Sequence, residues 1–351
     1  MKFSDVLDIR NGRNQRQVEN ANGKYPIYGS GGVMGRATDF ICDAGTVVIG
    51  RKGSINNPIF VDEPFWNVDT AFGLVAHRDV LLPKYLFYFC VNFDFERLNT
   101  TVTIPSLTKA NLLQIEIKVP DMDEQRHVVS VLDKICRLTD LQQQELHNLD
   151  QLVKSRFIEL FASVEAEDTL QNLCTFIDYR GKTPEKAESG LPFITAKNIR
   201  MHRMSFDTLE YISKETYDRV MTRGFPQIGD VVFTTEAPLG NVCRIPFIET
   251  EFYIGQRIIT MQTERLEPAY LEYALSSNEF KRKIAEKSSG STVTGIRSKL
   301  LEQLTIPVPP RALQEQFAAF VEQTDKSKLA VQKGLQELEI LKKSLMQQYF
   351  G

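Results

Sequence analysis

The chain has 351 residues, a formal net charge of −3, and 42% hydrophobic and 25% charged residues. This length exceeds that of one small domain, and the composition is typical of a globular protein with more than one core. Its apolar runs are too short for a membrane helix and its first residues do not resemble a secretory leader, so we expect a cytoplasmic protein without membrane contact. Five scattered cysteines and four scattered histidines predict neither a disulfide framework nor a metal centre.

Basic and amide side chains are concentrated near the start of the chain. Between Arg10 and Arg36 there are five basic residues and a single acidic one, Glu19, together with six Asn and Gln residues. Arg, Asn and Gln carry the forked groups that can read base edges in DNA. On these residues alone, a solvated loop explains the segment as well as nucleic-acid binding does.

The sequence repeats itself after roughly half its length. The matching segments keep the same order in both copies, which indicates a tandem duplication with an insertion in the second copy around residues 201–223. The matches are residues 45–48 with 229–232, 83–88 with 268–273, 101–103 with 292–294, 117–120 with 306–309, and Glu124-Gln125 with Glu315-Gln316.

Each copy begins with a mixed region and ends in a long helical one. β-rich runs such as 47–49 and 231–233 alternate with Gly, Asn and Pro, and a short helix is predicted after a proline at Pro83–Asn92 and at Pro268–Ser276. We therefore expect an α/β domain over residues 1–119, a long helix over 120–163, a second α/β domain over 164–309 and a second long helix over 310–351.

The two long helices are predicted at Asp121–Phe161 and Ala312–Phe350, where apolar residues recur at helical spacing. A helix of ~40 residues is about 60 Å long, which is too long to be buried against one domain of this size. We expect the two helices to pair as an antiparallel coiled coil that separates two heads related by a pseudo-twofold axis, in an α+β fold. The residues expected to pair the helices are Ile135, Leu138, Leu149, Val331, Leu338 and Leu345, with Thr324 close to the same seam.

Short motifs that would indicate an enzyme are incomplete in this chain. Asn57-Pro58-Ile59-Phe60 is similar to the loop with which adenine methyltransferases hold their target amine, but no cofactor loop precedes it. Gly181-Lys182-Thr183 lacks the first glycine of a phosphate-binding loop, and Glu116-Ile117-Lys118 lacks a correctly spaced acidic partner. We therefore expect a protein without a catalytic site and without a cofactor.

The duplicated pattern of a head followed by a long helix resembles the specificity subunit of type I restriction–modification systems. The resemblance covers almost the whole chain, and its individual motifs are weak while their arrangement is specific. It departs where the second copy has Thr195-Ala196-Lys197-Asn198 in place of the glycine-rich Gly29-Ser30-Gly31-Gly32, which predicts that the heads read different sequences. The residues that carry it are Arg10-Asn11-Gly12, the segment 25–32, Leu191-Pro192-Phe193-Ile194, Gly229-Asp230-Val231-Val232 and the two Ile-x-Val-Pro junctions with the Glu-Gln that follows each.

This resemblance implies a non-catalytic, DNA-binding subunit with two target recognition domains, each reading one half of a bipartite, asymmetric site in double-stranded DNA. It also implies that the helices set the spacer and dock two methyltransferase subunits, with motor-nuclease subunits joining for cleavage. The DNA-contacting residues expected in the first head are Arg10, Asn11, Arg13, Asn14, Gln15, Tyr28, Ser30, Arg51, Lys52 and Thr103. Those expected in the second head are Tyr179, Arg180, Lys182, Lys197, Asn198, Thr292, Thr294 and Arg297.

An alternative interpretation has a different function. A coiled-coil scaffold whose heads bind proteins, without contact to DNA, would show the same duplication and the same long helices. The basic, amide-rich segment between Arg10 and Arg36 favours DNA over this alternative.

Overall fold

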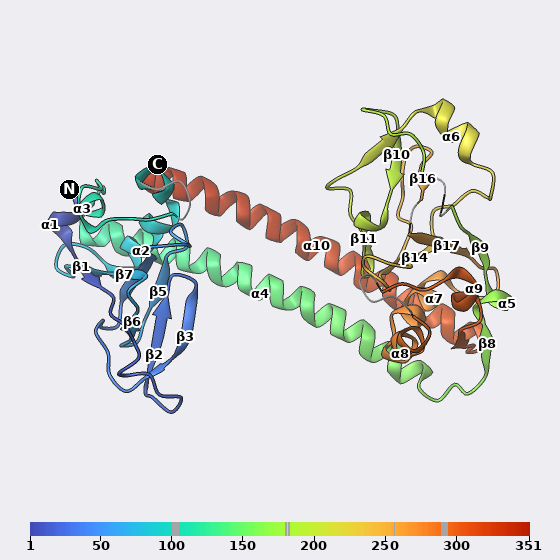
Figure 1. Ribbon diagram of the computed structural model, residues 1–351, viewed down its shortest axis with the longest axis horizontal. Coiled ribbons are helices and arrows are strands. Elements are labelled where there is room, and N and C mark those ends of the chain that lie inside the picture. Colours follow the sequence, from blue (N-terminus) through green and yellow to red (C-terminus); the bar gives the residue numbers. More distant parts are fainter. Residues whose placement is uncertain (100–104, 180, 182, 256, 289–293) are drawn as a thin grey trace. The chain divides into compact units, whose positions relative to one another are not determined.

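A computed structural model describes residues 1–99, 105–179, 181, 183–255, 257–288 and 294–351 (Figure 1). The chain divides into two compact units, each containing one head and parts of both long helices. Unit 1 comprises Met1–Gln144 and Val331–Gly351, and unit 2 comprises Glu145–Ala330. The long helices are α4 (Met122–Phe161) and α10 (Arg311–Phe350). The fold is α+β, with two heads in tandem.

The part of the chain before α4, called head one, is built on a four-stranded antiparallel sheet in the order β1-β7-β4-β5. A smaller sheet, β3-β2-β6, contains one parallel pair between β2 and β6. The predicted helix after Pro83 is confirmed with the expected bounds. The elements are α1 (Phe3–Val6), β1 (Leu7–Asn11), β2 (Tyr25–Gly29), β3 (Gly32–Ala37), β4 (Thr46–Gly50), β5 (Ile59–Val61), β6 (Trp66–Asn67), β7 (Ala71–Ala76), α2 (Pro83–Asn92), η1 (Phe95–Leu98) and α3 (Lys109–Leu113).

The part of the chain between α4 and α10, called head two, repeats this topology. Its main sheet has the order β9-β17-β14-β15, and β10 pairs in parallel with β16 as β2 does with β6. The helix after Pro268 also has the expected bounds. The elements are β8 (Glu167–Thr169), α5 (Leu170–Leu173), β9 (Thr175–Ile177), β10 (Leu191–Ile194), η2 (Ala196–Asn198), β11 (Ile199–Arg200), β12 (Arg203–Met204), β13 (Glu210–Ile212), α6 (Lys214–Val220), β14 (Val231–Thr234), β15 (Val242–Arg244), β16 (Tyr253–Ile254), β17 (Ile258–Gln262), α7 (Pro268–Ser276), α8 (Asn278–Lys287), α9 (Ser298–Glu302) and β18 (Thr305–Pro307).

The strand pair β11-β12 and helix α6 distinguish head two from head one. They lie between β10 and β14, in the segment where the drift of the repeat interval predicted an insertion. In head one, the corresponding stretch from β2 to β4 contains only the hairpin strand β3 and a loop. Strand β13 takes the antiparallel place beside β10 that β3 takes beside β2.

Each head is joined to a long helix by a buried glutamine in the first turn of that helix. Gln125 is fully buried; its Oε1 accepts from Leu82 N at 2.8 Å, and its Nε2 donates to the carbonyls of Val80 and Pro120, both at 2.9 Å. Because α2 begins directly after Leu82, this side chain fixes the start of α2 against the start of α4.

The second copy has the same joint, made by Gln314. This side chain is 1% exposed, accepts from Glu267 N at 2.9 Å and donates to Pro309 O at 2.8 Å. The sequence match of Gln125 with Gln316 is therefore wrong, since Gln316 is exposed on the surface of α10. Two glutamines within Leu313–Phe317 made the pairing ambiguous, and burial resolves it.

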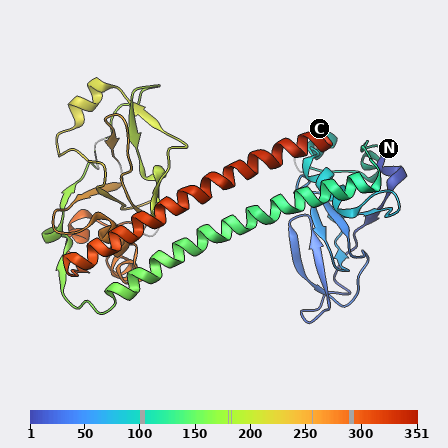
Figure 2. The ribbon, with the colours of Figure 1, turned by 180° about the vertical axis from the view of Figure 1, so that it is seen from behind.

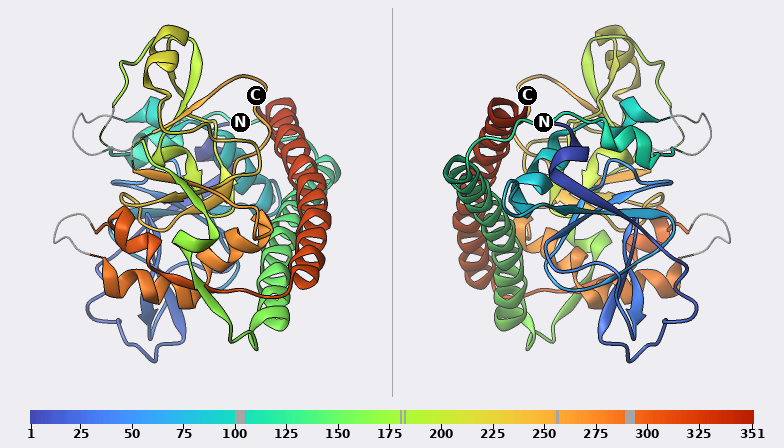
Figure 3. Two further views of the ribbon diagram at one scale, coloured as in Figure 1. Left: turned by 90° about the vertical axis from the view of Figure 1, so that its right-hand side faces the viewer. Right: turned by 90° about the vertical axis from the view of Figure 1, so that its left-hand side faces the viewer.

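In unit 1 the first part of α4 lies antiparallel to the last part of α10 (Figure 2). Val128 and Leu132, near the start of α4, share a core with Met346, near the end of α10. Phe350 then packs on α2, with its ring centroid 5.0 Å from that of Tyr85. Viewed end-on, α2 lies between the main sheet and these helix segments (Figure 3).

Unit 2 shows the same arrangement with the roles of the helices exchanged. Phe161, at the end of α4, lies 4.8 Å from Tyr270 of α7 and 5.5 Å from Phe317 of α10 (ring centroids). Further along the two helices, Lys328 Nζ lies 2.7 Å from an Asp150 carboxylate oxygen. The second long helix thus completes the core of the first head, and the first long helix completes the core of the second head.

The residues expected to pair the helices fall into two groups. Ile135 is buried, and Leu149, Val331, Leu338 and Leu345 are half-buried on their helices, while Thr324 is 5% exposed. Leu138 is a correction, because 47% of it is exposed. Burial on α4 follows alternating steps of four and three residues through Ile135, Thr139 and Gln142, and Leu138 lies one residue away from that row.

Candidate nucleic-acid interface

The basic segment of head one follows directly on β1. Arg10 and Asn11 end that strand, and Arg13 and Asn14 lie in the loop beyond it, all with exposed side chains, whereas Gln15 is half-buried. The backbone of this loop is held in place, because Trp66 Nε1 donates to Arg13 O at 3.0 Å and Arg13 N donates to Asn67 O at 2.8 Å. The loop therefore presents polar and basic side chains from a fixed backbone.

A second basic loop, residues 51–54, follows β4. Arg51 and Lys52 are exposed, and both backbone amides donate to Thr70 O, at 2.8 and 3.2 Å. Ser30, in the β2–β3 turn, lies beside this loop: a Cβ at Gly53 would be 3.8 Å from Ser30 Oγ. A Cβ at Gly50 would clash with Ser54 O at 2.3 Å, so the close return of the loop requires glycine at residue 50.

Both basic segments lie at one edge of the main sheet. Strand β7 runs antiparallel to both β1 and β4, with Phe72 opposite Asn11 on one side and Ile49 on the other. The carboxyl ends of β1 and β4 therefore meet at the start of β7. This topology brings Arg10, Asn11 and Arg51 to the same edge although they are far apart in the sequence.

Tyr28 is half-buried in head one. Its ring packs edge-on against Phe65 at 5.3 Å, and burial raises the pKa of its hydroxyl. The ring is therefore held in an apolar cluster of head one, two residues before Ser30.

Two residues expected to contact DNA in head two are instead part of its structure. Tyr179 is 1% exposed, and its hydroxyl donates to Gly224 O at 2.7 Å and accepts from Arg223 N at 2.8 Å. Asn198 is also 1% exposed; its Oδ1 accepts from Thr195 N at 2.9 Å, and its Nδ2 donates to Ser205 O and Thr208 O. Both side chains bind backbone groups, so neither is available to DNA.

The other expected residues of head two are exposed where the structure describes them. Lys197 lies in η2, Thr294 precedes α9 and Arg297 is the N-cap of that helix, all with exposed side chains. Thr103, Arg180, Lys182 and Thr292 lie outside the described residues.

Arg257 of head two was not expected from the sequence; it is an exposed residue with a left-handed backbone (φ 67°). Arg257 O accepts from Thr235 N, just as Thr70 O accepts from Arg51 N in head one, so Arg257 takes the place of Thr70. The Arg257 guanidinium lies 3.0 Å from Glu236. Glu236 takes the place of Lys52, because Glu236 forms an isolated β-bridge to Gly295 as Lys52 does to Ser106. The same edge thus carries two basic side chains in head one and an acid–base pair in head two. None of the matching repeat segments contains Arg257, so its equivalence to Thr70 follows from the backbone hydrogen bonds alone.

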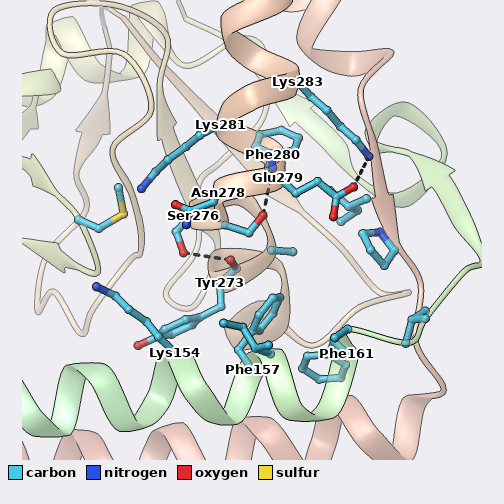
Figure 4. Close-up of a pocket in the computed structure, with 18 of the residues that line it drawn as sticks. Lys154, Phe157, Phe161, Tyr273, Ser276, Asn278, Glu279, Phe280, Lys281 and Lys283 are labelled. Carbon is cyan, nitrogen blue, oxygen red and sulfur yellow. Dashed lines mark hydrogen bonds and ion pairs between the residues drawn. The ribbon is translucent and has the colours of Figure 1, made fainter.

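Unit 2 also contains a cavity of about 620 Å³ between the end of α4 and helices α7 and α8. Phe157, Phe161, Tyr273 and Phe280 line it, and Lys154 and Lys281 extend along the same side of it (Figure 4). It is an apolar cavity with a basic rim.

Beside this cavity, a buried carboxylate joins the inserted segment of head two to α7. Glu272 Oε1 lies 2.8 Å from His202 Nδ1, and Glu272 Oε2 accepts from Arg244 Nε at 2.6 Å. The His202 ring stacks on Tyr273 at 4.2 Å. Because both Glu272 carboxylate oxygens have side-chain partners, the cluster stabilises the contact between the inserted segment and α7.

None of the helices in the described ranges is long and apolar enough to cross a membrane. Among those same residues, no group of three or more His, Cys, Asp or Glu side chains is placed to hold a metal ion.

Comparison with known proteins identifies the family. The profile of the type I restriction modification DNA specificity domain matches residues 1–151 and 167–340. The type I restriction enzyme MjaVIII specificity subunit of Methanocaldococcus jannaschii is 21% identical over 335 residues, covering 87% of this chain and 75% of the relative. The putative MjaX specificity subunit of the same organism is 22% identical over 309 residues, covering 78% and 68%.

Two solved structures share the fold over the whole chain. The type I restriction–modification S subunit from M. genitalium has a TM-score of 0.66 at 17% identity, with 100% of this chain and 95% of that chain covered. A chain from a structure on complex assembly and conformational transition of the type I R-M system has a TM-score of 0.59 at 18% identity, with 100% and 96% covered.

Two tandem heads, each with loops at one sheet edge and each joined to a long helix, define a DNA-recognition protein of duplicated architecture. The chain belongs to the type I restriction modification DNA specificity domain family, with one matched region in each half. It is the specificity subunit of a type I restriction–modification system, which recognises DNA sequence.

Proposed function

We propose that each head reads one half of a bipartite, asymmetric site in double-stranded DNA, through the loops at the carboxyl ends of β1 and β4 in head one and of β9 and β14 in head two. The observation that carries this proposal is the charge difference at equivalent positions, Lys52 in head one and Glu236 with Arg257 in head two. A lysine can meet a phosphate or a guanine, whereas a glutamate accepts from cytosine. Two heads of one fold would then recognise two different half-sites.

The proposed contact residues divide by chemistry. Arg10, Asn11 and Asn14 have the forked groups that pair with purine edges, and Arg51 and Lys52 suit guanine or phosphate. In head two, Lys197, Thr294, Arg297 and Arg257 are the exposed polar side chains in the corresponding region. Tyr179 and Asn198 are not included, since both are buried.

We further propose that the paired parts of α4 and α10 set the distance between the half-sites and dock two methyltransferase subunits, with motor-nuclease subunits completing the complex in the cytoplasm. Support comes from apolar side chains that the helices leave exposed. Leu141 on α4 is 54% exposed and Ile340 on α10 is 69% exposed, both in unit 1. Exposed apolar side chains on a long helix are suited to a partner helix.

The methyl transfer is assigned to the partner subunits, so this chain acts without catalysis of its own. Two of its cysteines are poorly suited to nucleophilic attack, because burial raises the pKa of the Cys42 and Cys174 thiols to about 12. A chain freed of its methyltransferase partner should leave duplex DNA unmethylated.

The direct test exchanges one head. Residues 1–119 are replaced by the matching head of another specificity subunit, and the recognised site is mapped by the methylation of a genome carrying the complex. One half of the site should change while the other stays the same. A change in both halves would contradict independent reading by the heads, and DNA binding that is absent at low salt would favour the protein-binding scaffold instead.

A further inference from the structure

The β2–β3 hairpin of head one ends in a ribbon with exposed apolar side chains. Its two strands pair from Tyr25 opposite Ala37 to Gly29 opposite Gly32, and β2 also pairs with β6 at Ile27 and Tyr28, so that only the turn and the last pair extend beyond β6 (Figure 1). At the turn, a Cβ at Gly31 or Gly32 would meet no atom within 4 Å. The turn itself therefore extends into open space.

The apolar side chains at this end are Val33 and Met34, which are 64% and 61% exposed. The pairing shifts between Ile27 and Tyr28, so that Ile27 faces Gly35 while Tyr28 faces Val33. Met34 is thus the extra residue of a β-bulge, and bulges of this kind redirect side chains near binding sites. Leaving two adjacent apolar side chains in water is unfavourable unless a partner covers them.

The residues around the ribbon point to DNA as that partner. Ser30, in the turn, touches the basic loop at residues 51–54, in which the exposed Lys52 follows Arg51, whose guanidinium lies 5.8 Å from the centroid of the Phe72 ring. A major groove about 12 Å wide admits the turn of a hairpin whose strands lie about 4.8 Å apart. With the ribbon in the groove, the basic loop would lie next to the phosphate backbone.

We propose that the β2–β3 ribbon enters the major groove and that Val33 and Met34 contact the C5-methyl groups of thymines in the half-site read by head one. The methyl group is the apolar feature of the major-groove edges, and apolar side chains are the groups that recognise it. This inference rests on the proposed function, because it assumes that head one reads DNA. It requires at least one A·T pair in that half-site.

The experiment removes single methyl groups from the DNA. The full chain, assembled with its methyltransferase partner, is titrated with a duplex that carries the mapped site, and each thymine of the head-one half is replaced in turn by deoxyuridine. At one or two positions the affinity should fall about fourfold for each thymine methyl group that Val33 or Met34 covers. In the Val33→Ala, Met34→Ala double variant, the same replacements should have no further effect.

The control is Val91→Ala, which shortens an apolar side chain on α2 that is 42% exposed in the same head. This variant should respond to deoxyuridine as the unchanged protein does. The inference is overturned if no thymine replacement weakens binding, or if the double variant loses the same factor as the unchanged protein.

A failure of the proposed function would be recognised separately. Scrambling the whole head-one half-site should abolish specific binding if that head reads DNA. If the scrambled duplex binds as well as the mapped one, head one does not read it. If scrambling abolishes binding while every deoxyuridine duplex binds normally, the thymine contact alone is wrong.

Discussion

A single buried glutamine in each copy determines how a head meets a long helix. Gln125 and Gln314 each accept from the backbone amide just before a helix, Leu82 N for α2 and Glu267 N for α7. Both also donate to the backbone carbonyl of the proline that closes the head, Pro120 and Pro309. A side chain that satisfies buried backbone groups in this way is costly to remove, because those groups lose their partners.

We expect Gln314→Leu to lower the free energy of unfolding by about 1–3 kcal/mol, since the Glu267 amide and the Pro309 carbonyl would be left buried and unpaired. Urea denaturation followed by circular dichroism measures this change. The matched control is Gln316→Leu, two residues away on the exposed side of α10, which should have little effect. Equal losses in both variants would mean that Gln314 does not form the joint.

The cysteines provide a second test at the scale of single residues. Four of them are buried, and burial raises the pKa of the Cys90 and Cys243 thiols as well as those of Cys42 and Cys174. Because the thiolate is the reacting form, iodoacetamide at about pH 8 should modify the half-buried Cys136 first and the other four only after denaturation. Peptide mass spectrometry identifies the modified residues, and rapid labelling of Cys42 in the folded protein would contradict its burial.

Residue type alone predicted the exposure of the candidate residues better in head one than in head two. Arg10, Asn11 and Arg51 are exposed at one sheet edge because strand order brings them there. Asn198 has the same chemistry as Asn11 but caps a turn, and Tyr179 fills a core. Whether an amide binds DNA or its own backbone depends on tertiary contacts that composition does not contain.

At the scale of elements, local signals were sufficient for the helices. A proline at the first position predicted the start of both α2 and α7. Apolar residues at helical spacing predicted both long helices. The prediction is wrong at Leu138, which is apolar but lies one residue away from the buried row and is exposed. The row itself contains Thr139 and Gln142, so hydrophobicity could not reveal it.

Gly334 tests how closely the two long helices approach in unit 1. It lies inside α10, and a Cβ there would be 2.8 Å from Gln142 Nε2 of α4, whose Oε1 is buried without a hydrogen-bond partner among the described residues. We expect Gly334→Ala to raise the free energy of unfolding by up to about 1 kcal/mol, because alanine favours the helix and the end of a glutamine side chain can turn aside. Thermal unfolding measures the change.

The reverse substitution at an exposed position of the same helix, Ala319→Gly, is the control and should lower stability by a similar amount. A loss of stability in Gly334→Ala would show that Gln142 is held in place and that the glycine is required for the close approach.

For the whole molecule, the duplication was the informative feature. It predicted two heads of one topology, and the strand orders β1-β7-β4-β5 and β9-β17-β14-β15 are the same. It did not predict that α10 completes the core of head one and α4 that of head two, as Phe350 on Tyr85 and Phe161 on Tyr270 show. Sequence matches relate a segment to its copy and contain no information on which copy it packs against.

Because each long helix packs against both heads, the proposal that the helices act as a ruler, setting the distance between the half-sites, can be tested by lengthening α4. Each long helix is continuous from the joint at its own head to the core of the other, so residues added to α4 lengthen the connection between the heads. Four residues inserted after Gln143 add roughly 6 Å and about one turn, which keeps the buried row of α4 nearly in phase. The complex should then recognise the same half-sites with a spacer longer by about one or two base pairs, at ~3.4 Å each.

Two residues inserted at the same place rotate the row by about 200° instead, and should abolish helix pairing and partner binding. Methylation mapping of a genome carrying each variant reads out the spacer, and gel filtration with the methyltransferase reads out assembly. An active complex with the four-residue insertion and an unchanged spacer would contradict the ruler, because the added length would then be absorbed without moving the half-sites apart.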